Sequence, residues 1–309
     1  MATVPLARCP SCGHQEGPRA GYRRLPWAYR HRGAVLPGGE CPDCGLRGLV
    51  VQPAPHEFEA LYAHSYFAGG DVRCGHVGDY FAERPALLRD AAALVAGLLE
   101  PARPPGASPG RLLELGTASG ALLEAARGRG WSVQGVEYSA AAAAEAGRHG
   151  VPVLVGGIEE AALPAGSFDV AFVGDVLEHV PDPAAVLREL ARVLAPGGAL
   201  VLRGPMATHS FARALGLAAT RALGRTRWLD EPPYHLWEFT PGPLRGLVAR
   251  AGLAIESFRQ SKTPPARTKP RGALEQAALA LLDPVNVAWT RATNSRGDRC
   301  TLVARRGRA

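Results

Sequence analysis

Residues 111–120 read RLLELGTASG, and this stretch decides the fold. Its first five residues form a short apolar run typical of a buried strand, and the glycines that follow mark a turn into a helix. Glycine at such a turn lets backbone N–H groups approach a ligand, and the N-terminus of the next helix favours a negative charge there. The segment therefore predicts a ligand-binding turn at the carboxyl end of a strand.

Strands and helices continue to alternate beyond this turn. Such alternation favours an α/β protein with a parallel sheet covered by helices on both faces. Counting 111–115, seven strands are expected, the other six at 132–136, 151–155, 168–173, 199–203, 253–258 and 300–305. The expected helices lie at 119–129, 139–148, 182–194, 241–251 and around 272–283.

The composition is that of an ordinary globular protein, with 47% apolar and 20% charged residues among 309. The net charge of +7 is concentrated near the C-terminus, where residues 245–309 hold 13 basic and 4 acidic residues. A nucleic-acid protein usually spreads its basic residues more widely. We therefore do not expect nucleic acid to be the partner, and an anionic small molecule would meet the C-terminal part.

The N-terminus lacks a basic start followed by an apolar core, so it does not predict a signal peptide. No run of about 18 apolar residues could span a bilayer. We therefore expect a cytoplasmic protein without a membrane partner. In that reducing compartment, paired cysteines favour metal over disulfide.

Two cysteine pairs stand near the N-terminus, in Cys9-Pro-Ser-Cys12-Gly and Cys41-Pro-Asp-Cys44-Gly. Each pair can form a tight knuckle, and two knuckles complete a tetrahedral zinc site. The segment between them is longer than in compact sites, so it requires a hairpin insert. A redox pair is the alternative, although a redox motif would normally open a helix. With four protein ligands, the zinc would be structural.

Glu137 closes the strand that follows the glycine turn, about 20 positions after it, where a carboxylate can accept both hydroxyls of a ribose. Dinucleotide binding is the competing interpretation, but it needs Gly-x-Gly-x-x-Gly. Gly116, Ala118 and Gly120 do not supply that spacing. The turn is better suited to the methionine end of S-adenosylmethionine.

An ordered series of motifs resembles the class I S-adenosylmethionine-dependent methyltransferases, across roughly 106–309. The series is LLELGTASG, VQGVEYS, GGIEE, SFDVAFVGDVLEHVPDP and LRELARVLAPGG. The resemblance implies a Rossmann-like seven-stranded methyltransferase fold. One departure is Ala118, which stands where the family's Gly-x-Gly-x-Gly core has its middle glycine and narrows the space beside the cofactor.

The resemblance also implies roles for particular residues. It assigns the methionine end of the cofactor to Glu114, Gly116, Thr117 and Gly120, and the ribose to Glu137. It places Tyr138, Ile158 and Glu159 around the adenine and Asp175 on the cofactor side of the fourth strand. Core packing is the alternative for Tyr138 and Ile158, and Glu159 is alternatively a solvated acid.

The cysteine pairs followed by EALYAHSYF resemble bacterial methyltransferases that carry an N-terminal zinc ribbon, several of which act on sugars or other small biosynthetic intermediates. The expected organisation is a zinc-ribbon module at 1–55 and a helical linker or cap at 56–105. The methyltransferase domain follows at 106–309, with inserts at 205–240 and 262–297.

A hydroxyl or enolisable carbon acceptor needs a base, commonly histidine. His235, in PPYHLWEF, is the first candidate, because it follows the insert that should cap the site. His179, in LEHV, is the second. Packing is the alternative for His179, and a plain hydrogen-bonding role for His235. The basic run at 259–271 is either a solvated loop or a clamp for an anionic acceptor.

The sequence thus predicts methyl transfer to an O or C atom of a small biosynthetic acceptor, with an anionic or sugar-linked one as an option. One alternative is an RNA methyltransferase whose zinc ribbon positions the RNA, but residues 1–52 lack a strong basic surplus. Another is a non-catalytic cofactor-binding protein, which would be expected to lose Glu137 or the glycine turn. The oligomeric state is left open.

Overall fold

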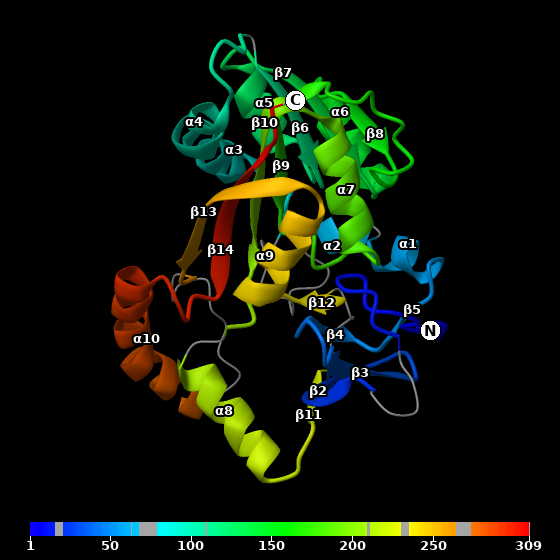
Figure 1. The fold of residues 1–309 in the computed structure, drawn as a ribbon, viewed down its shortest axis with the longest axis vertical. Helices are drawn as coiled ribbons and strands as arrows, with labels where there is room; N and C mark the ends of the chain where they lie inside the picture. The colour runs from blue at the N-terminus through cyan, green and yellow to red at the C-terminus, as the bar shows by residue number, and fades with distance from the viewer. Residues whose placement is uncertain are drawn as a thin grey trace.

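The computed structural model of the chain describes residues 1–15, 21–62, 64–67, 79–108, 110–208, 211–229, 235–263 and 273–308. Three sheets organise these residues, a large one in the methyltransferase-like part, a smaller one near the N-terminus and a two-stranded one. Figure 1 shows the large sheet above the small one, with the helices α8 and α10 beside the small one.

The large sheet has seven strands in the order β13-β14-β10-β9-β6-β7-β8. All its strands run parallel except β14, which is antiparallel to both of its neighbours. This arrangement confirms the predicted α/β, Rossmann-like fold. The strands are β6 (Arg111–Leu115), β7 (Ser132–Glu137), β8 (Val153–Val155), β9 (Phe168–Gly174), β10 (Leu194–Pro205), β13 (Leu253–Ser261) and β14 (Arg299–Arg306).

Helices cover both faces of this sheet. One face packs against α3 (Arg84–Leu94), the π-helix η2 (Val95–Leu99) and α5 (Ala121–Arg127). The other packs against α7 (Pro183–Val193) and α9 (Pro241–Arg250). Alternate residues of β6 serve the two faces, so Leu112 and Leu113 enter different apolar clusters. The short α4 (Glu100–Ala102) and α6 (Ala140–Arg148) complete the domain.

The capping residues show why two of these helices begin where they do. The side chain of Ser139 accepts a hydrogen bond from the Ala142 N–H at the start of α6. Asp182 accepts from the N–H groups of Ala184 and Ala185 at the start of α7. Such caps satisfy donors that the first helical turn leaves without a partner. They set where the segments after β7 and β9 turn away from the sheet.

The smaller sheet combines the N-terminal residues with the 205–240 insert. Its order is β11-β2-β3-β4-β12, in which β2 (Arg23–His31), β3 (Ala34–Glu40) and β4 (Arg47–Leu49) come from the N-terminus. The outer strands β11 (Arg227–Leu229) and β12 (Trp237–Glu238) come from the insert. The strands β1 (Thr3–Pro5) and β5 (Val51–Pro53) form the two-stranded sheet. The sheet of the expected 1–55 module is therefore completed by residues from outside it.

The remaining described helices lie in the expected linker and in the two inserts. α1 (Glu57–Leu61) and α2 (His64–Phe67) lie in the expected 56–105 linker. α8 (Phe211–Ala222) and α10 (Ala273–Thr293) lie side by side in the two inserts (Figure 1). α10 is longer than the helix expected at 272–283, because it continues through Pro284. Among the described helices, none is long and apolar enough to cross a membrane.

Candidate active site and candidate metal centre

At two positions, the turn after β6 has a backbone conformation that only glycine adopts without strain. Gly116 has a φ of +77°, and a Cβ there would lie 2.3 Å from Cγ2 of Val176. Gly120 has a φ of +73°, and its Cβ would lie 2.8 Å from that of Ala146 in α6. Gly116 therefore lets the turn approach the segment after β9, and Gly120 lets α5 pack against α6.

A cavity of about 560 Å³ opens at the carboxyl ends of β6, β7 and β9. Ligand-binding pockets usually fall in this size range, and open α/β sheets bind ligands at this edge. Six of the nine predicted cofactor residues line the cavity: Gly116, Glu137, Tyr138, Ile158, Glu159 and Asp175. The fold therefore brings most of the predicted cofactor residues to one cavity.

The other three predicted cofactor residues, Glu114, Thr117 and Gly120, are not among the residues that line this cavity. Thr117 points its Cγ2 toward Gly135 of β7, within 2.4 Å of where a Cβ would stand. Glu114 is buried, and its Oε2 has no hydrogen-bond partner among the described residues. Burial, and next the charge of Glu137, raise the pKa of Glu114 well above its usual value.

Two backbone N–H groups hold the Glu137 carboxylate in place. Its Oε2 accepts from the N–H of Ala118 at 2.9 Å, and its Oε1 accepts from that of Ser139 at 2.9 Å. Burial raises the pKa of Glu137 even though these bonds oppose the shift. Ala118 takes a left-handed conformation with a φ of +45° while it donates this bond. Each carboxylate oxygen can accept a second hydrogen bond, as two ribose hydroxyls would require.

The residues predicted around adenine differ in exposure. Ile158 is buried and lines the cavity, whereas the Tyr138 side chain is 49% exposed. A half-exposed ring does not fit the core-packing alternative for Tyr138. Glu159 lines the cavity but is exposed, so both the adenine contact and the solvated acid remain consistent with its position.

Asp175 forms an ion pair that the sequence did not reveal. Both of its carboxylate oxygens lie 2.7 Å from Nη2 of Arg299, in β14. The pair joins the end of β9 to the antiparallel strand of the same sheet. Burial raises the pKa of the neighbouring cavity residue Tyr80 to about 12, and the charge of Asp175 adds to the shift. The signal for Arg299 was weak, because it lies about 120 residues after Asp175.

The two predicted base candidates meet beside the cavity. The rings of His179 and His235 pack edge to face, with centroids 4.8 Å apart. His179 lines the cavity, while His235 is not among its lining residues. Nδ1 of His179 lies 2.8 Å from the hydroxyl of Tyr62. His179 thus borders the cavity, and its ring contacts that of His235.

Glu178 lies beside both histidines and was missed by the sequence analysis. Its Oε1 is 3.7 Å from Nε2 of His179, and one ligand atom from each of Glu178, His179 and His235 lies within 4.8 Å of the others. Glu178 is 2% exposed, and its Oε1 has no hydrogen-bond partner in the described part of the chain. Burial and the charge of Asp175 raise its pKa to about 8. Its place in the LEHV motif, next to His179, was the available signal.

Comparison with known proteins decides the family. Residues 83–257, more than half of the chain, match the family described as "Methyltransferase domain". The chain belongs to this methyltransferase family. "Ubiquinone biosynthesis O-methyltransferase" of Xanthomonas axonopodis pv. citri (strain 306) is 34% identical over 185 residues, which cover 57% of this chain and 74% of that protein. The protein of the same name from Ralstonia nicotianae is 34% identical over 157 residues, covering 48% of this chain and 65% of that protein.

Solved structures agree on the fold. The crystal structure of a SAM-dependent methyltransferase from Archaeoglobus fulgidus superposes with a TM-score of 0.50 and 14% identity, covering 74% of this chain and 99% of that chain. At this identity the similarity concerns the fold alone. The family match and the similar O-methyltransferases make the protein an S-adenosylmethionine-dependent methyltransferase.

Aromatic rings from the segment before the family match form a wall of the methyltransferase's cavity. Phe58, Tyr62, Tyr66, Phe67 and Tyr80 all line the cavity. The rings of Tyr62 and Tyr66 pack edge to face at 5.3 Å, and those of Tyr66 and Phe67 at 4.9 Å. Such a wall is complementary to a flat, largely apolar group.

The basic run of the methyltransferase is only partly described. Its Lys262 side chain is 5% exposed, and its Nζ lies 2.5 Å from Oδ2 of Asp298 and 3.7 Å from Oδ1 of Asp283. A lysine buried between two carboxylates is not available to clamp an anionic acceptor. Arg267, Lys269 and Arg271 lie outside the described residues, and Arg259 is exposed.

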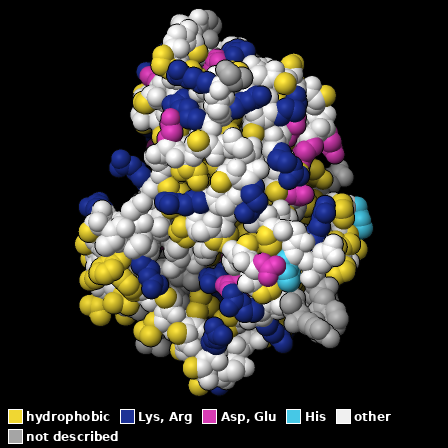
Figure 2. All heavy atoms as spheres, viewed as in Figure 1, with side chains coloured by type: hydrophobic (Ala, Val, Ile, Leu, Met, Phe, Trp, Pro, Cys, Tyr) yellow, Lys and Arg dark blue, Asp and Glu magenta, His cyan; other side chains and the backbone are white. Residues whose placement is uncertain are grey.

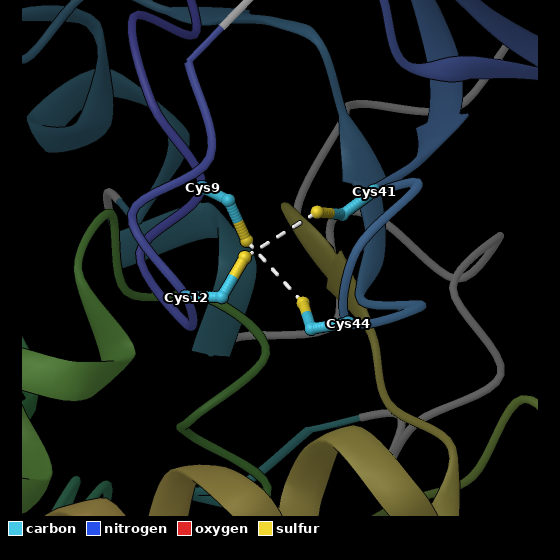
Figure 3. A group of neighbouring side chains, drawn as sticks. All are labelled: Cys9, Cys12, Cys41 and Cys44. Atoms are coloured by element: carbon cyan, nitrogen blue, oxygen red, sulfur yellow. Dashed lines mark hydrogen bonds between the residues drawn. The ribbon is translucent and has the colours of Figure 1, made fainter. Parts of the chain in front are cut away.

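The four predicted zinc ligands of the methyltransferase converge at its N-terminal end. Figure 3 shows Cys9 and Cys12 on one loop facing Cys41 and Cys44 on another. All four Sγ atoms lie within 4.8 Å of one another, with Cys9–Cys44 and Cys12–Cys41 separations of 3.6 Å. Four sulfurs around a zinc at 2.3 Å would stand about 3.8 Å apart, so the set fits a tetrahedral ion. The four thiols form no disulfide.

The glycines of the two knuckles explain their shape. The N–H of Gly13 donates to the carbonyl of Cys9 at 2.9 Å, and that of Gly45 to the carbonyl of Cys41 at 3.0 Å. Both glycines have a positive φ, +79° and +72°. The hairpin of β2 and β3 accounts for the long spacing between the pairs, as the sequence required.

Proposed function

We propose that this methyltransferase transfers the methyl group of S-adenosylmethionine to a hydroxyl oxygen of a small acceptor that carries a flat ring, with His179 as the base. The observation that carries the proposal is the position of His179, which lies on the cavity wall with Tyr62, Glu178 and His235 around it. The aromatic wall favours a ring. The similar proteins named as O-methyltransferases favour oxygen over carbon as the methylated atom.

The cofactor would occupy the part of the cavity formed by the three strand ends. Glu137 would accept the ribose hydroxyls, Gly116 would let the methionine end approach the turn, and Ile158 and Tyr138 would flank the adenine. Glu159 and Asp175 complete this set. Bound S-adenosylmethionine supplies a methyl group already activated by its sulfonium charge, so alignment and a base are what the chain must add.

The residues around His179 provide that base. In the tautomer whose Nδ1–H donates to the hydroxyl oxygen of Tyr62, Nε2 is unprotonated and would accept the acceptor's hydroxyl proton. The imidazolium formed would lie 3.7 Å from the Glu178 carboxyl, and its positive charge would favour the ionised form of that acid. His235 would restrict the orientation of the His179 ring through their edge-to-face contact.

We further propose that Cys9, Cys12, Cys41 and Cys44 hold one structural zinc. With all four positions taken by thiolates, the ion has no open site for a substrate. Its part would be to fix the small sheet, to which the insert contributes β12 next to His235.

The test follows labelled methyl groups from S-adenosylmethionine into catechols and other phenols, into sugars that lack an aromatic ring, and into RNA. Transfer to phenols, lost by about 10²–10⁴-fold in His179→Ala with cofactor affinity intact, is the expected result. His235→Ala should lose less, because His235 does not line the cavity. Label in RNA or the sugars alone would refute the aromatic acceptor. A larger loss in His235→Ala would return the base to His235, the first candidate from the sequence.

A further inference from the structure

The helix α10 buries polar side chains and exposes apolar ones, which is the opposite of an ordinary surface helix. Among its described side chains the buried ones are polar, namely Asp283, Asn286 and Thr290, which are 2%, 0% and 3% exposed. Its exposed side chains include large apolar ones, namely Leu281, Val285 and Trp289, which are 75%, 58% and 49% exposed. Each set repeats every three or four residues, so the two sets occupy opposite faces of the helix.

Specific contacts fix this orientation. Oδ1 of Asn286 accepts from the N–H of Phe211 at 2.9 Å, and its Nδ2 donates to the carbonyl of Arg296 at 2.9 Å. Oδ1 of Asp283 lies 3.7 Å from the buried Nζ of Lys262, an ion pair without a hydrogen bond among the described residues. The two hydrogen bonds of Asn286 and this ion pair would be lost if α10 turned its apolar face inward, because buried polar groups need their partners. The outward apolar face is therefore a property of the folded protein.

The neighbouring helix α8 extends the same face. The ring of Phe211 at the start of α8 contacts that of Trp289 edge to face at 6.0 Å. Leu215, within α8, and Leu223, just after it, are 69% and 67% exposed. We call Leu215, Leu223, Leu281, Val285 and Trp289 the apolar patch. Figure 2 shows hydrophobic side chains gathered on the surface where α8 and α10 lie.

The exposed charged side chains that the structure describes on α8 and α10 are basic. Arg221, Arg225 and Arg291 are exposed on or beside the two helices. The sequence of α8 contains no acid, and that of α10 contains two, Glu275 near its start and the buried Asp283. Leucines and an interfacial tryptophan flanked by arginines are typical of helices that lie in the surface of an anionic membrane.

We propose that α8 and α10 dock the methyltransferase on the surface of a membrane that contains anionic lipids, with the apolar patch at the level of the headgroups. The sequence predicts no membrane partner, because it contains no apolar run of the length that spans a bilayer. A helix lying in the interface needs no such segment. A second copy of the chain is disfavoured as the occupant, because a symmetric contact would bring the arginines of both copies together.

Co-sedimentation of the full chain with vesicles tests this docking, and it does not depend on the methyl acceptor. Vesicles of phosphatidylcholine containing phosphatidylglycerol should bind the protein, and vesicles of phosphatidylcholine alone should bind it at least about tenfold more weakly. Added salt should weaken the binding, since exposed charges are screened. Failure to bind the anionic vesicles would overturn the proposal.

The decisive variant is Leu281→Asp combined with Val285→Asp, which places two charges in the apolar patch. Its binding to anionic vesicles should fall by about tenfold or more, because burial of apolar area is lost and like charges are added. Val35→Asp, at a 51% exposed position in β3, is the matched control and should bind like the wild type. Thermal unfolding and S-adenosylmethionine titration verify that both variants are folded. Unchanged binding of the double variant, or its conversion of a dimer to a monomer without lipid, would refute membrane docking.

Discussion

The hydroxyl of Tyr62 lies 2.8 Å from Nδ1 of His179, although 117 residues separate them in the chain. Tyr62 ends α1, before the family match, and His179 follows β9 inside it. A hydrogen bond to one ring nitrogen sets which nitrogen is left to act, so Tyr62 acts through His179 as a positioning residue. The segment before the methyltransferase domain therefore takes part in the proposed chemistry.

Replacing Tyr62 by phenylalanine should lower kcat by about tenfold and leave S-adenosylmethionine affinity unchanged. The ring and its contact with Tyr66 would remain, while the bond to His179 would be lost. Steady-state kinetics with the identified acceptor, together with cofactor titration, measure both effects. Tyr66→Phe is the control, since Tyr66 lines the same wall. If both variants lost the same activity, the hydroxyl of Tyr62 would have no special role.

Glu178 should make the stability of the protein depend on pH. Its pKa is raised to about 8 in the folded state, so the folded protein holds this proton more tightly than the unfolded chain does. The contribution of this proton to the unfolding free energy is complete below the unfolded pKa of about 4.3 and is lost as the pH rises to about 8. Glu178→Gln carries no ionisable group and should escape this loss.

The measurement is chemical unfolding of the wild type and Glu178→Gln at several pH values between 5 and 8. The difference in unfolding free energy should shift in favour of the glutamine variant by about 1–4 kcal/mol over this range. The pH–rate profile should lose the limb that rises as Glu178 ionises. A constant difference in stability would mean that Glu178 keeps an ordinary pKa.

Removal of the Glu137 carboxylate should weaken cofactor binding. Glu137→Gln preserves the shape but loses the charged acceptor, so affinity for S-adenosylmethionine and for its demethylated product should fall by about 1–3 kcal/mol. Titration calorimetry measures the change. Glu256→Gln, at a 48% exposed side chain in β13, should bind normally. Unchanged affinity in Glu137→Gln would remove Glu137 from the ribose site.

Loss of the proposed zinc should lower the rate of methyl transfer. Metal analysis should find about one zinc per chain in the wild type and in Cys300→Ala, whose cysteine lies outside the cluster, and none in Cys41→Ser. Because β12 pairs with β4 two residues after His235, Cys41→Ser should lower methyl transfer while cofactor binding persists. Full activity in a zinc-free variant would separate the metal from the site.

Much of the fold was predictable because local patterns agree with it. Seven apolar runs became the seven strands of the large sheet, since buried parallel strands read as continuous apolar stretches. The glycine turn and Glu137 were found for the same reason, because strand ends of a parallel sheet meet at one edge. The cysteine knuckles were equally clear, since each is complete within five residues.

Thr117 and Gly120 show where pattern alone was insufficient. Both belong to the glycine turn, yet the structure turns one side chain onto Gly135 and uses the other position to seat α5 against α6. Which residues of a turn face the ligand depends on a few backbone angles, and the motif does not specify them. Arg299 was missed because an ion pair between distant strands leaves no periodic signal.

The sequence by itself determined the family, the sheet and the two cysteine knuckles, because these depend on local spacing and on the side-chain periods of strands and helices. Tertiary structure alone decided that Tyr62, Glu178, His179 and His235 gather in one place, since they come from three separate segments. It also decided that the insert completes the N-terminal sheet and that α10 turns its apolar face outward. Both depend on long-range hydrogen bonds, such as those of Asn286, whose partners no local pattern identifies.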